Sequence, residues 1–104
     1  MSEINKFWAV LKQKKWLTNN IIELQFQKPK NFEYMAGQFV QWRIIEPENA
    51  ALRPYSLSSA PYQDELEFCV KILPEGRGSA LAEKIQVGEI LEFQGPKGQF
   101  INRE

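Results

Sequence analysis

Short segments in which apolar and polar residues alternate recur along the chain, and they predict antiparallel β-strands. The clearest covers 65–72, where the apolar side chains stand at every second residue and therefore share one face of a strand. The same alternation covers 22–27 and 40–44, and a shorter one covers 91–94 before a turn at 95–98. Each of these strands is expected to bury one face and expose the other.

Less regular segments complete the expected elements. The stretch 7–16 predicts a longer first strand, and 53–58 predicts a further one. One short helix is expected to begin at Ser79, a residue type that caps helix N-termini, and to continue until Gly88 ends it. Six short strands with one short helix predict an all-β fold, a small closed or nearly closed barrel in which closure removes the exposed sheet edges.

The composition fits one ordinary globular domain. The chain has 104 residues, of which 43% are hydrophobic and 25% are charged, and this length allows one core but no second nucleotide-binding unit. Thirteen basic and thirteen acidic residues cancel, so the field that attracts polynucleotides is missing. We therefore expect one domain over 1–104 and no nucleic-acid partner.

The residue types that are missing restrict the chemistry. The chain has no histidine, and Cys69 is its only cysteine. This excludes an internal disulfide, the common metal sites and the usual nucleophile and base pairs. Any redox or group-transfer chemistry must therefore come from a cofactor. No signal peptide or membrane-spanning stretch is apparent, so a cytoplasmic location without a membrane partner is expected.

The segment Arg53-Pro54-Tyr55-Ser56-Leu57-Ser58-Ser59 combines a cation, an aromatic ring and several hydroxyls. On a strand, Arg53 and Tyr55 share a face, so one side chain can hold an anion while the other stacks on a planar ring. Ser56 points the other way, and its hydroxyl and backbone N–H can donate hydrogen bonds. An ordinary strand with a surface arginine and a half-buried tyrosine explains this segment, taken alone, equally well.

A glycine-rich turn, Gly76-Arg77-Gly78-Ser79, stands directly before the expected helix. Backbone N–H groups at a helix N-terminus, approached closely through glycines, favour a phosphate. Taken alone, the same four residues are more often an ordinary turn followed by a capped helix with nothing bound.

Together these segments resemble the motifs of the ferredoxin–NADP reductase family. Arg53-Pro54-Tyr55-Ser56 resembles its Arg-x-Tyr-Ser flavin motif, and Cys69-Val70-Lys71 resembles its next flavin-lining strand. Gly76-Arg77-Gly78-Ser79 is similar to its phosphate turn, and the turn at 95–98 to its Gly-Pro-x-Gly turn. The matches occur in the family's order over about 6–100, and an ordered set is far more specific than any single match.

The resemblance implies a six-stranded antiparallel Greek-key barrel with a capping helix, which binds FAD, or alternatively FMN. Arg53 would pair with the pyrophosphate or phosphate. Tyr55 would lie against the isoalloxazine, and Ser56 would hydrogen-bond near N5 and O4, so that these two are the residues expected at the catalytic edge. Ile72-Leu73-Pro74 offers no aromatic partner for adenine, and Tyr62 is a weaker candidate for that role, since an exposed loop tyrosine is the plainer interpretation.

The same resemblance assigns the remaining cofactor contacts. Val70 and Lys71 would offer backbone groups to the pyrimidine end of the ring, with the Val70 side chain inside the barrel. Lys71 would also stabilise negative charge on the reduced flavin. Gly76, Gly78 and Ser79 would hold phosphate at the helix N-terminus.

The family places an NAD(P)-binding domain after the barrel, and this sequence contains none. We expect either a sequence cut at a domain boundary, which is the favoured interpretation, or a stand-alone module that works with a partner chain. The expected function is the flavin module of an oxidoreductase that moves electrons between NAD(P)H and an acceptor protein or small molecule, and such a module is not a complete enzyme.

Two other functions stay open at this stage. One is a binding module of the oligonucleotide or oligosaccharide barrel type, using aromatic side chains to stack on ligand rings. The other is a structural or regulatory barrel that binds no flavin. The basic cluster Lys12, Lys14 and Lys15 is more often a solvated surface than a docking site for an acidic carrier. Trp8, Trp16 and Trp42 are expected in the core or at the barrel ends, and Cys69 is expected to be buried or to face the flavin.

Overall fold

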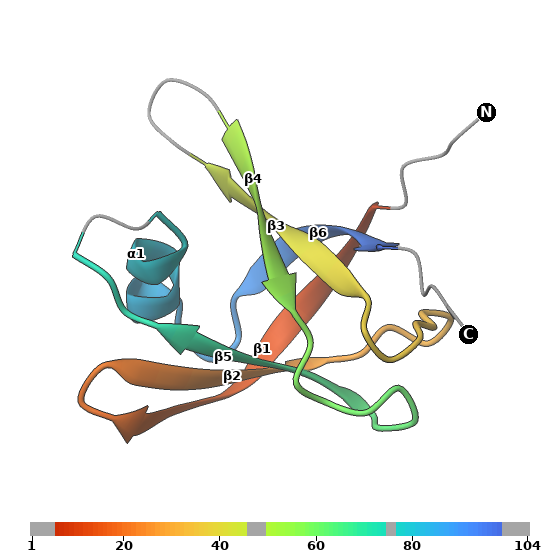
Figure 1. The fold of residues 1–104 in the computed structure, drawn as a ribbon, viewed down its shortest axis with the longest axis horizontal. Helices are drawn as coiled ribbons and strands as arrows, with labels where there is room; N and C mark the ends of the chain where they lie inside the picture. Colours follow the sequence, from red (N-terminus) through yellow and green to blue (C-terminus); the bar gives the residue numbers. More distant parts are fainter. Residues whose placement is uncertain (1–5, 46–49, 75–76, 99–104) are drawn as a thin grey trace, which may run out of the picture.

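The computed structural model describes residues 6–45, 50–74 and 77–98. It contains the expected six strands and one helix (Figure 1). The elements are, in chain order, β1 (Lys6–Thr18), β2 (Ile21–Gln27), β3 (Phe39–Ile45), β4 (Ala50–Ser56), β5 (Glu65–Lys71), α1 (Arg77–Lys84) and β6 (Ile90–Lys97). The alternating segments therefore all form strands, which confirms the predicted fold class.

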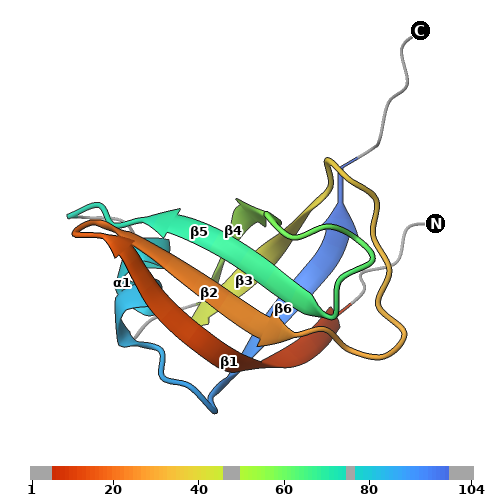
Figure 2. The ribbon, with the colours of Figure 1, turned by 90° about the horizontal axis from the view of Figure 1, so that it is seen from below.

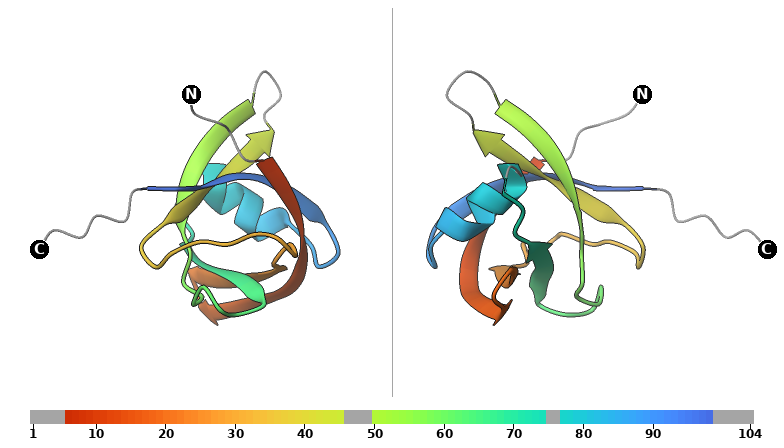
Figure 3. Two further views of the ribbon diagram at one scale, coloured as in Figure 1. Left: turned by 90° about the vertical axis from the view of Figure 1, so that its right-hand side faces the viewer. Right: turned by 60° about the vertical axis from the view of Figure 1, so that its left-hand side comes forward.

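The strands form one sheet in the order β4-β3-β6-β1-β2-β5, and every neighbouring pair is antiparallel. Because β6 inserts between β1 and β3, the connections cross over in the manner of a Greek key. The sheet curls on itself, so that β4 and β5, its two edges, come close to each other (Figure 3). Figure 2 shows β5, β2 and β1 side by side along one wall.

The barrel is not closed between these two edges. Among the described residues, β4 and β5 share no ladder. Just beyond β4, the Ser58 N–H donates a hydrogen bond of 2.8 Å to the Glu67 carbonyl oxygen. Of the two alternatives expected from the sequence, the described residues therefore form the nearly closed barrel and not the closed one. Helix α1 contacts β3 and β5, on the two sides of the remaining gap. The helix therefore covers the part of the core that the open sheet leaves uncovered.

The inner face of the sheet carries the predicted apolar positions. Buried residues stand at every second position of β2, β3 and β5, as the alternation requires. Their aromatic rings pack edge to face around Phe68, which meets Phe26 at 5.9 Å and Trp42 at 5.2 Å between ring centroids. Phe93 of β6 stacks on Phe68 at 5.9 Å. One aromatic cluster therefore joins four strands.

The helix differs from the sequence prediction at both ends. It begins at Arg77, two residues before Ser79, and ends at Lys84, ahead of a turn at 87–88 where Gly88 has a φ of +98°. Ser79 therefore lies inside the first turn and is not the N-cap. In the part of the chain that the structure describes, no helix has the length and apolarity needed to cross a membrane.

Two strands also differ from their predicted bounds. β4 begins at Ala50 and ends at Ser56, not at 58. β6 continues through the expected turn to Lys97, which lies opposite Phe39. The register between β3 and β6 shifts by one residue between Phe39 and Gln41, so that Gly95 and Pro96 both lie opposite Val40. Such a bulge in β6 tolerates a residue that lacks a ladder N–H, as Pro96 does.

Lys14 fixes the C-terminal end of α1. Its ammonium donates hydrogen bonds of 2.6 Å to the Glu83 carbonyl oxygen and 3.0 Å to the Ile85 carbonyl oxygen. These carbonyls lie at the negative end of the helix, where a cation is stabilising. One member of the basic cluster therefore has a structural role that neither interpretation of the cluster predicted.

We expect Lys14→Met to lower the free energy of unfolding by about 1 kcal/mol, because the last-turn carbonyls lose a charged donor while the aliphatic contacts remain. Urea unfolding measures this change. Lys12→Met, on an exposed neighbouring position of the same strand, is the matched control and should change stability by less than half as much. Equal effects of the two substitutions would contradict the capping role.

Candidate functional site

The Arg-x-Tyr-Ser segment forms the end of β4, one of the two edge strands. In the β3–β4 ladder, Tyr55 lies opposite Val40 and Arg53 lies opposite Trp42. Val40 and Trp42 are fully buried, and residues directly opposite each other in a ladder share a face. Arg53 and Tyr55 therefore project from the inner face, at the open side of the barrel.

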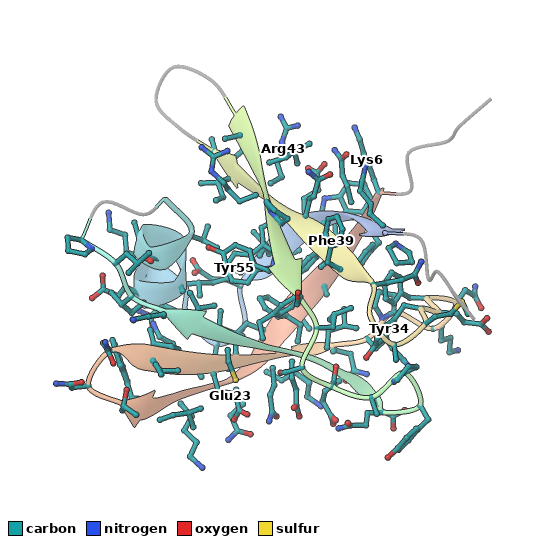
Figure 4. All side chains as sticks on the ribbon, in the orientation of Figure 1. Lys6, Glu23, Tyr34, Phe39, Arg43 and Tyr55 are labelled. Carbon is teal, nitrogen blue, oxygen red and sulfur yellow. The ribbon has the colours of Figure 1, made fainter. Side chains whose placement is uncertain are left out.

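Tyr55 lies between the barrel wall and the helix. Its ring stacks on Trp42 with a centroid distance of 3.9 Å and an interplanar angle of 24°. Its hydroxyl lies so close to Gly78 that a Cβ at that position would overlap it. Figure 4 shows Tyr55 on the side of β4 where α1 lies. The contact between Tyr55 and Gly78 thus connects the flavin-motif strand directly to the first turn of α1.

The Tyr55 phenol and the Arg53 guanidinium differ in their surroundings. Burial raises the pKa of the Tyr55 phenol above its ordinary value, and the positive charge of Arg53 partly offsets this effect. The phenol is therefore protonated at neutral pH. The Arg53 side chain is exposed, and its Nη1 donates a hydrogen bond of 3.2 Å to the neighbouring Leu52 carbonyl oxygen. Most of its donors are thus accessible to an anion.

The first turn of α1 is anchored by Ser79, which is buried. Its hydroxyl donates a hydrogen bond of 3.0 Å to the Lys71 carbonyl oxygen and accepts one of 2.9 Å from the Leu73 N–H. The side chain therefore holds the helix to the end of β5, and what the turn offers to a ligand is backbone N–H groups. Gly76 lies outside the described residues.

The edge of β5 faces the gap. Both the N–H and the carbonyl of Glu67 bond toward Ser58 and Ser59, away from β2. Since backbone groups of an edge strand alternate in direction, Cys69 and Lys71 present theirs to the same side. The Val70 side chain is buried in the barrel, as expected, and that of Lys71 is exposed.

Ser56 ends β4 opposite Phe39, with its side chain exposed and directed away from the face that Tyr55 occupies. Continuing the contact between Ser58 and Glu67 in antiparallel fashion puts Ser56 across the gap from Cys69. The two predicted flavin-lining segments therefore flank one opening.

The outer face of the same wall is acidic. Glu23, Glu65 and Glu67 lie on neighbouring positions of β2 and β5, and Figure 4 shows Glu23 directed away from the barrel. Burial raises the pKa of Glu67, and the charges of Glu23 and Glu65 raise it further. Phosphate groups are therefore favoured on the inner side, near Arg53, and disfavoured here. Cys69 is exposed on this face, so the expectation that it is buried was wrong.

A separate cleft of about 520 Å³ lies at another end of the barrel. It is bounded by the start of β1, the segment 29–33 and the end of β6, with Phe7 and Phe32 among its lining residues. None of the residues expected to bind flavin lines this cleft, so it does not belong to the predicted site.

The aromatic residues divide into two groups. Trp42 is buried in the core, as predicted, whereas Trp8 and Trp16 are 58% and 47% exposed and so do not lie in the core. Tyr62 is 87% exposed, which confirms the plainer interpretation of a surface tyrosine. Sequence reasoning did not connect Trp42 to the site, because its contact with Tyr55 depends on strand register.

The architecture is that of a ferredoxin reductase-like flavin-binding domain: an antiparallel barrel, open at an Arg-x-Tyr-Ser edge strand and covered there by a short helix. The chain belongs to the oxidoreductase FAD-binding domain family, whose model matches residues 8–101. FAD is therefore the cofactor of its family, and the binding module of the oligonucleotide barrel type is not supported.

The similar proteins include reductases. The propane 2-monooxygenase reductase component of Mycolicibacterium goodii is 34% identical over 87 residues, which are 80% of this chain and 24% of that protein. The reductase component of the naphthalene 1,2-dioxygenase system of Pseudomonas putida, a ferredoxin–NAD(P)(+) reductase component, is 33% identical over 82 residues, covering 78% and 24%. The chain spans about a quarter of the length of these two relatives and 4% of a dual oxidase 1 from Canis lupus familiaris, which it also matches.

Among solved structures, a ferredoxin NADP+ reductase from Neisseria gonorrhoeae with bound FAD and NADP superposes with a TM-score of 0.79. It is 26% identical, and the match covers 92% of this chain and 39% of that one. The described fold is thus found within a longer FAD-containing protein.

The residues of the site fit FAD. The Arg53 guanidinium and the N–H groups of the first α1 turn suit phosphates, and the β5 edge presents backbone donors and acceptors to the gap. The indole N–H of Trp42 is buried without a hydrogen-bond partner among the described residues. Such a group is stabilised when a ligand or water supplies an acceptor. The charged and backbone groups around the gap therefore match the phosphates and the polar edge of FAD, and the Trp42 indole N–H is a buried donor beside Tyr55 without a partner among the described residues.

The contact between Tyr55 and Gly78 generates a testable coupling. Alanine is favoured over glycine within a helix by about 1 kcal/mol, but at position 78 its Cβ would displace the Tyr55 hydroxyl. We expect Gly78→Ala to be at least about 1 kcal/mol more favourable in a Tyr55→Ala background than in the parent chain. Urea unfolding of the four proteins measures this difference.

Ala80→Gly is the control for this cycle, since Ala80 is exposed on the same helix. Its effect on the free energy of unfolding should be the same with and without Tyr55. If Gly78→Ala likewise changes the free energy of unfolding by the same amount with and without Tyr55, Tyr55 does not lie against the helix.

Proposed function

We propose that this chain holds FAD for an oxidoreductase that transfers electrons between NAD(P)H and an acceptor protein or small molecule. The family assignment supports the cofactor, and the relatives named as reductase components of oxygenase systems support the reaction class. The observation that carries the proposal is the position of Arg53 and Tyr55, which share one face of the open edge strand, with Tyr55 against the first turn of α1.

Arg53 is proposed to hold the pyrophosphate. A planar guanidinium can engage two phosphate oxygens at once, and its exposure at the opening leaves it accessible. The N–H groups of Gly78 and Ser79 point out of the helix N-terminus and would share the charge. Gly76, from the same turn, is proposed as a further contact. The Ser79 hydroxyl acts indirectly, by holding this turn to Lys71.

The ring system is proposed to lie in the gap between β4 and β5. Tyr55 would support one face of it, since Trp42 holds the phenol from behind. Ser56 would donate to the N5 and O4 edge. At the pyrimidine edge, the ligand would meet the backbone of Cys69 and Lys71, on either side of Val70, since the Val70 backbone faces β2. The Lys71 ammonium would stabilise negative charge there.

Bound FAD supplies the redox chemistry, since it accepts and releases electrons. The residues of this chain bind the cofactor, orient its ring and shield one face of it from water. The pyridine nucleotide needs an NAD(P)-binding domain or partner chain, and the electrons need a redox partner. A cytoplasmic location is part of the same proposal.

Titration of the purified chain with FAD, followed by quenching of flavin fluorescence, tests this function. The parent chain should bind FAD, and Arg53→Ala should raise the Kd about tenfold or more, because charge-assisted hydrogen bonds to phosphate are lost. Arg53→Lys should recover only part of the affinity, since an ammonium does not engage two oxygens in a plane.

Arg43→Ala is the matched control, because Arg43 pairs with Glu92 at 3.6 Å, away from the proposed site. This variant should keep the parent Kd. A parent chain that does not quench flavin fluorescence would contradict the proposal and support the flavin-free structural barrel.

A further inference from the structure

A buried hydrogen-bond network stands at the point where the two edge strands meet. Tyr34, which precedes β3, and Ser59, which follows β4, are both buried, at 7% exposure each. The Tyr34 hydroxyl lies 2.9 Å from the Ser59 carbonyl oxygen and 3.0 Å from the Ser59 Oγ. The Glu67 N–H donates to the Ser59 Oγ at 3.1 Å. Three segments distant in sequence therefore converge on one serine.

The hydrogens in this network can be assigned. The Tyr34 hydroxyl has one proton, which it donates to the Ser59 carbonyl oxygen, so it must accept from the Ser59 hydroxyl. The Ser59 Oγ then donates to Tyr34 and accepts from the Glu67 N–H. Each polar group of the Tyr34–Ser59–Glu67 network is thereby satisfied, so removing one member leaves a buried group without a partner.

This network lies beside the site described above. Ser58, next to Ser59, makes the backbone contact with Glu67 that joins the two edges. From this contact, β4 runs back to Ser56 and β5 runs on to Cys69, so the gap opens directly beyond it. Figure 4 shows Tyr34 on the opposite side of the β4 end from Tyr55. Tyr34 thus holds the junction from outside the gap.

We propose that Tyr34 is a positioning residue for the flavin site, which fixes the width of the gap between Ser56 and Cys69 by holding Ser59. The inference rests on the proposed function, since it concerns the same opening. Backbone contacts to a planar ring require both walls at hydrogen-bond distance simultaneously, and small displacements of positioned groups lower binding and reactivity strongly. Ser59 and Tyr34 set that distance without touching the ligand.

The test compares FAD binding by the full 104-residue chain with that of Tyr34→Phe, Ser59→Ala and the double variant. Tyr34→Phe keeps the buried ring and removes only the hydroxyl, and we expect it to raise the Kd about five- to tenfold. Ser59→Ala should raise the Kd by a similar factor. The double variant should bind FAD no more weakly than the single variant with the higher Kd, because both substitutions break the same network. At saturating FAD, the visible absorption bands of the flavin should shift in the single variants.

Two controls separate positioning from general stability. Lys14→Met loses a cap at the C-terminal end of α1, far from Ser59 in the sequence. It should keep the parent Kd and spectrum even if its unfolding midpoint falls by as much as those of Tyr34→Phe and Ser59→Ala. Tyr62→Phe removes an exposed hydroxyl and should change neither quantity. A parent Kd and spectrum in both Tyr34→Phe and Ser59→Ala would overturn the inference, as would an equal loss in Lys14→Met. A parent chain that binds no FAD overturns the proposed function itself, and the inference with it.

Discussion

The single contact between the two edge strands determines how the rest of this domain is arranged. A curled sheet that closed completely would satisfy its edge groups and leave no room for a ligand. Among the described residues, β4 and β5 share no ladder, and the chain just beyond β4 joins β5 by the backbone contact between Ser58 and Glu67. Polar backbone is therefore left facing a gap, at the place where Arg53 and Tyr55 project from β4. Backbone groups along such an opening bond to water or to a ligand, and the family to which the chain belongs binds FAD.

The parts of the site are held in place largely by residues outside the motifs. Among the motif residues, Ser79 ties the start of α1 to β5. Tyr34 binds Ser59 and so fixes the segment that follows β4. Trp42 supports the ring of Tyr55 from the core. The motif residues thus supply the chemistry, and a surrounding set of buried bonds supplies their spacing.

The sequence predicted the strands well because alternation of apolar residues is a local signal. Ile22, Phe26, Phe68 and Val70 are buried where the period of two requires it. The position of Ser79 was misjudged, because a serine after glycine resembles an N-cap locally, whereas its hydroxyl bonds across to β5. The contacts around Trp42 and the incomplete closure were beyond local reasoning, since both depend on strand register and on which edges meet.

The proposed site requires that FAD lies in the gap between β4 and β5. Amide chemical shifts of the ¹⁵N-labelled chain, recorded with and without FAD, locate the bound cofactor. We expect the largest changes at Tyr55 and Ser56, at Cys69 and Lys71, and at Gly78. Changes confined to the cleft around Phe7 and Phe32, with the amides along the gap unmoved, would contradict this site.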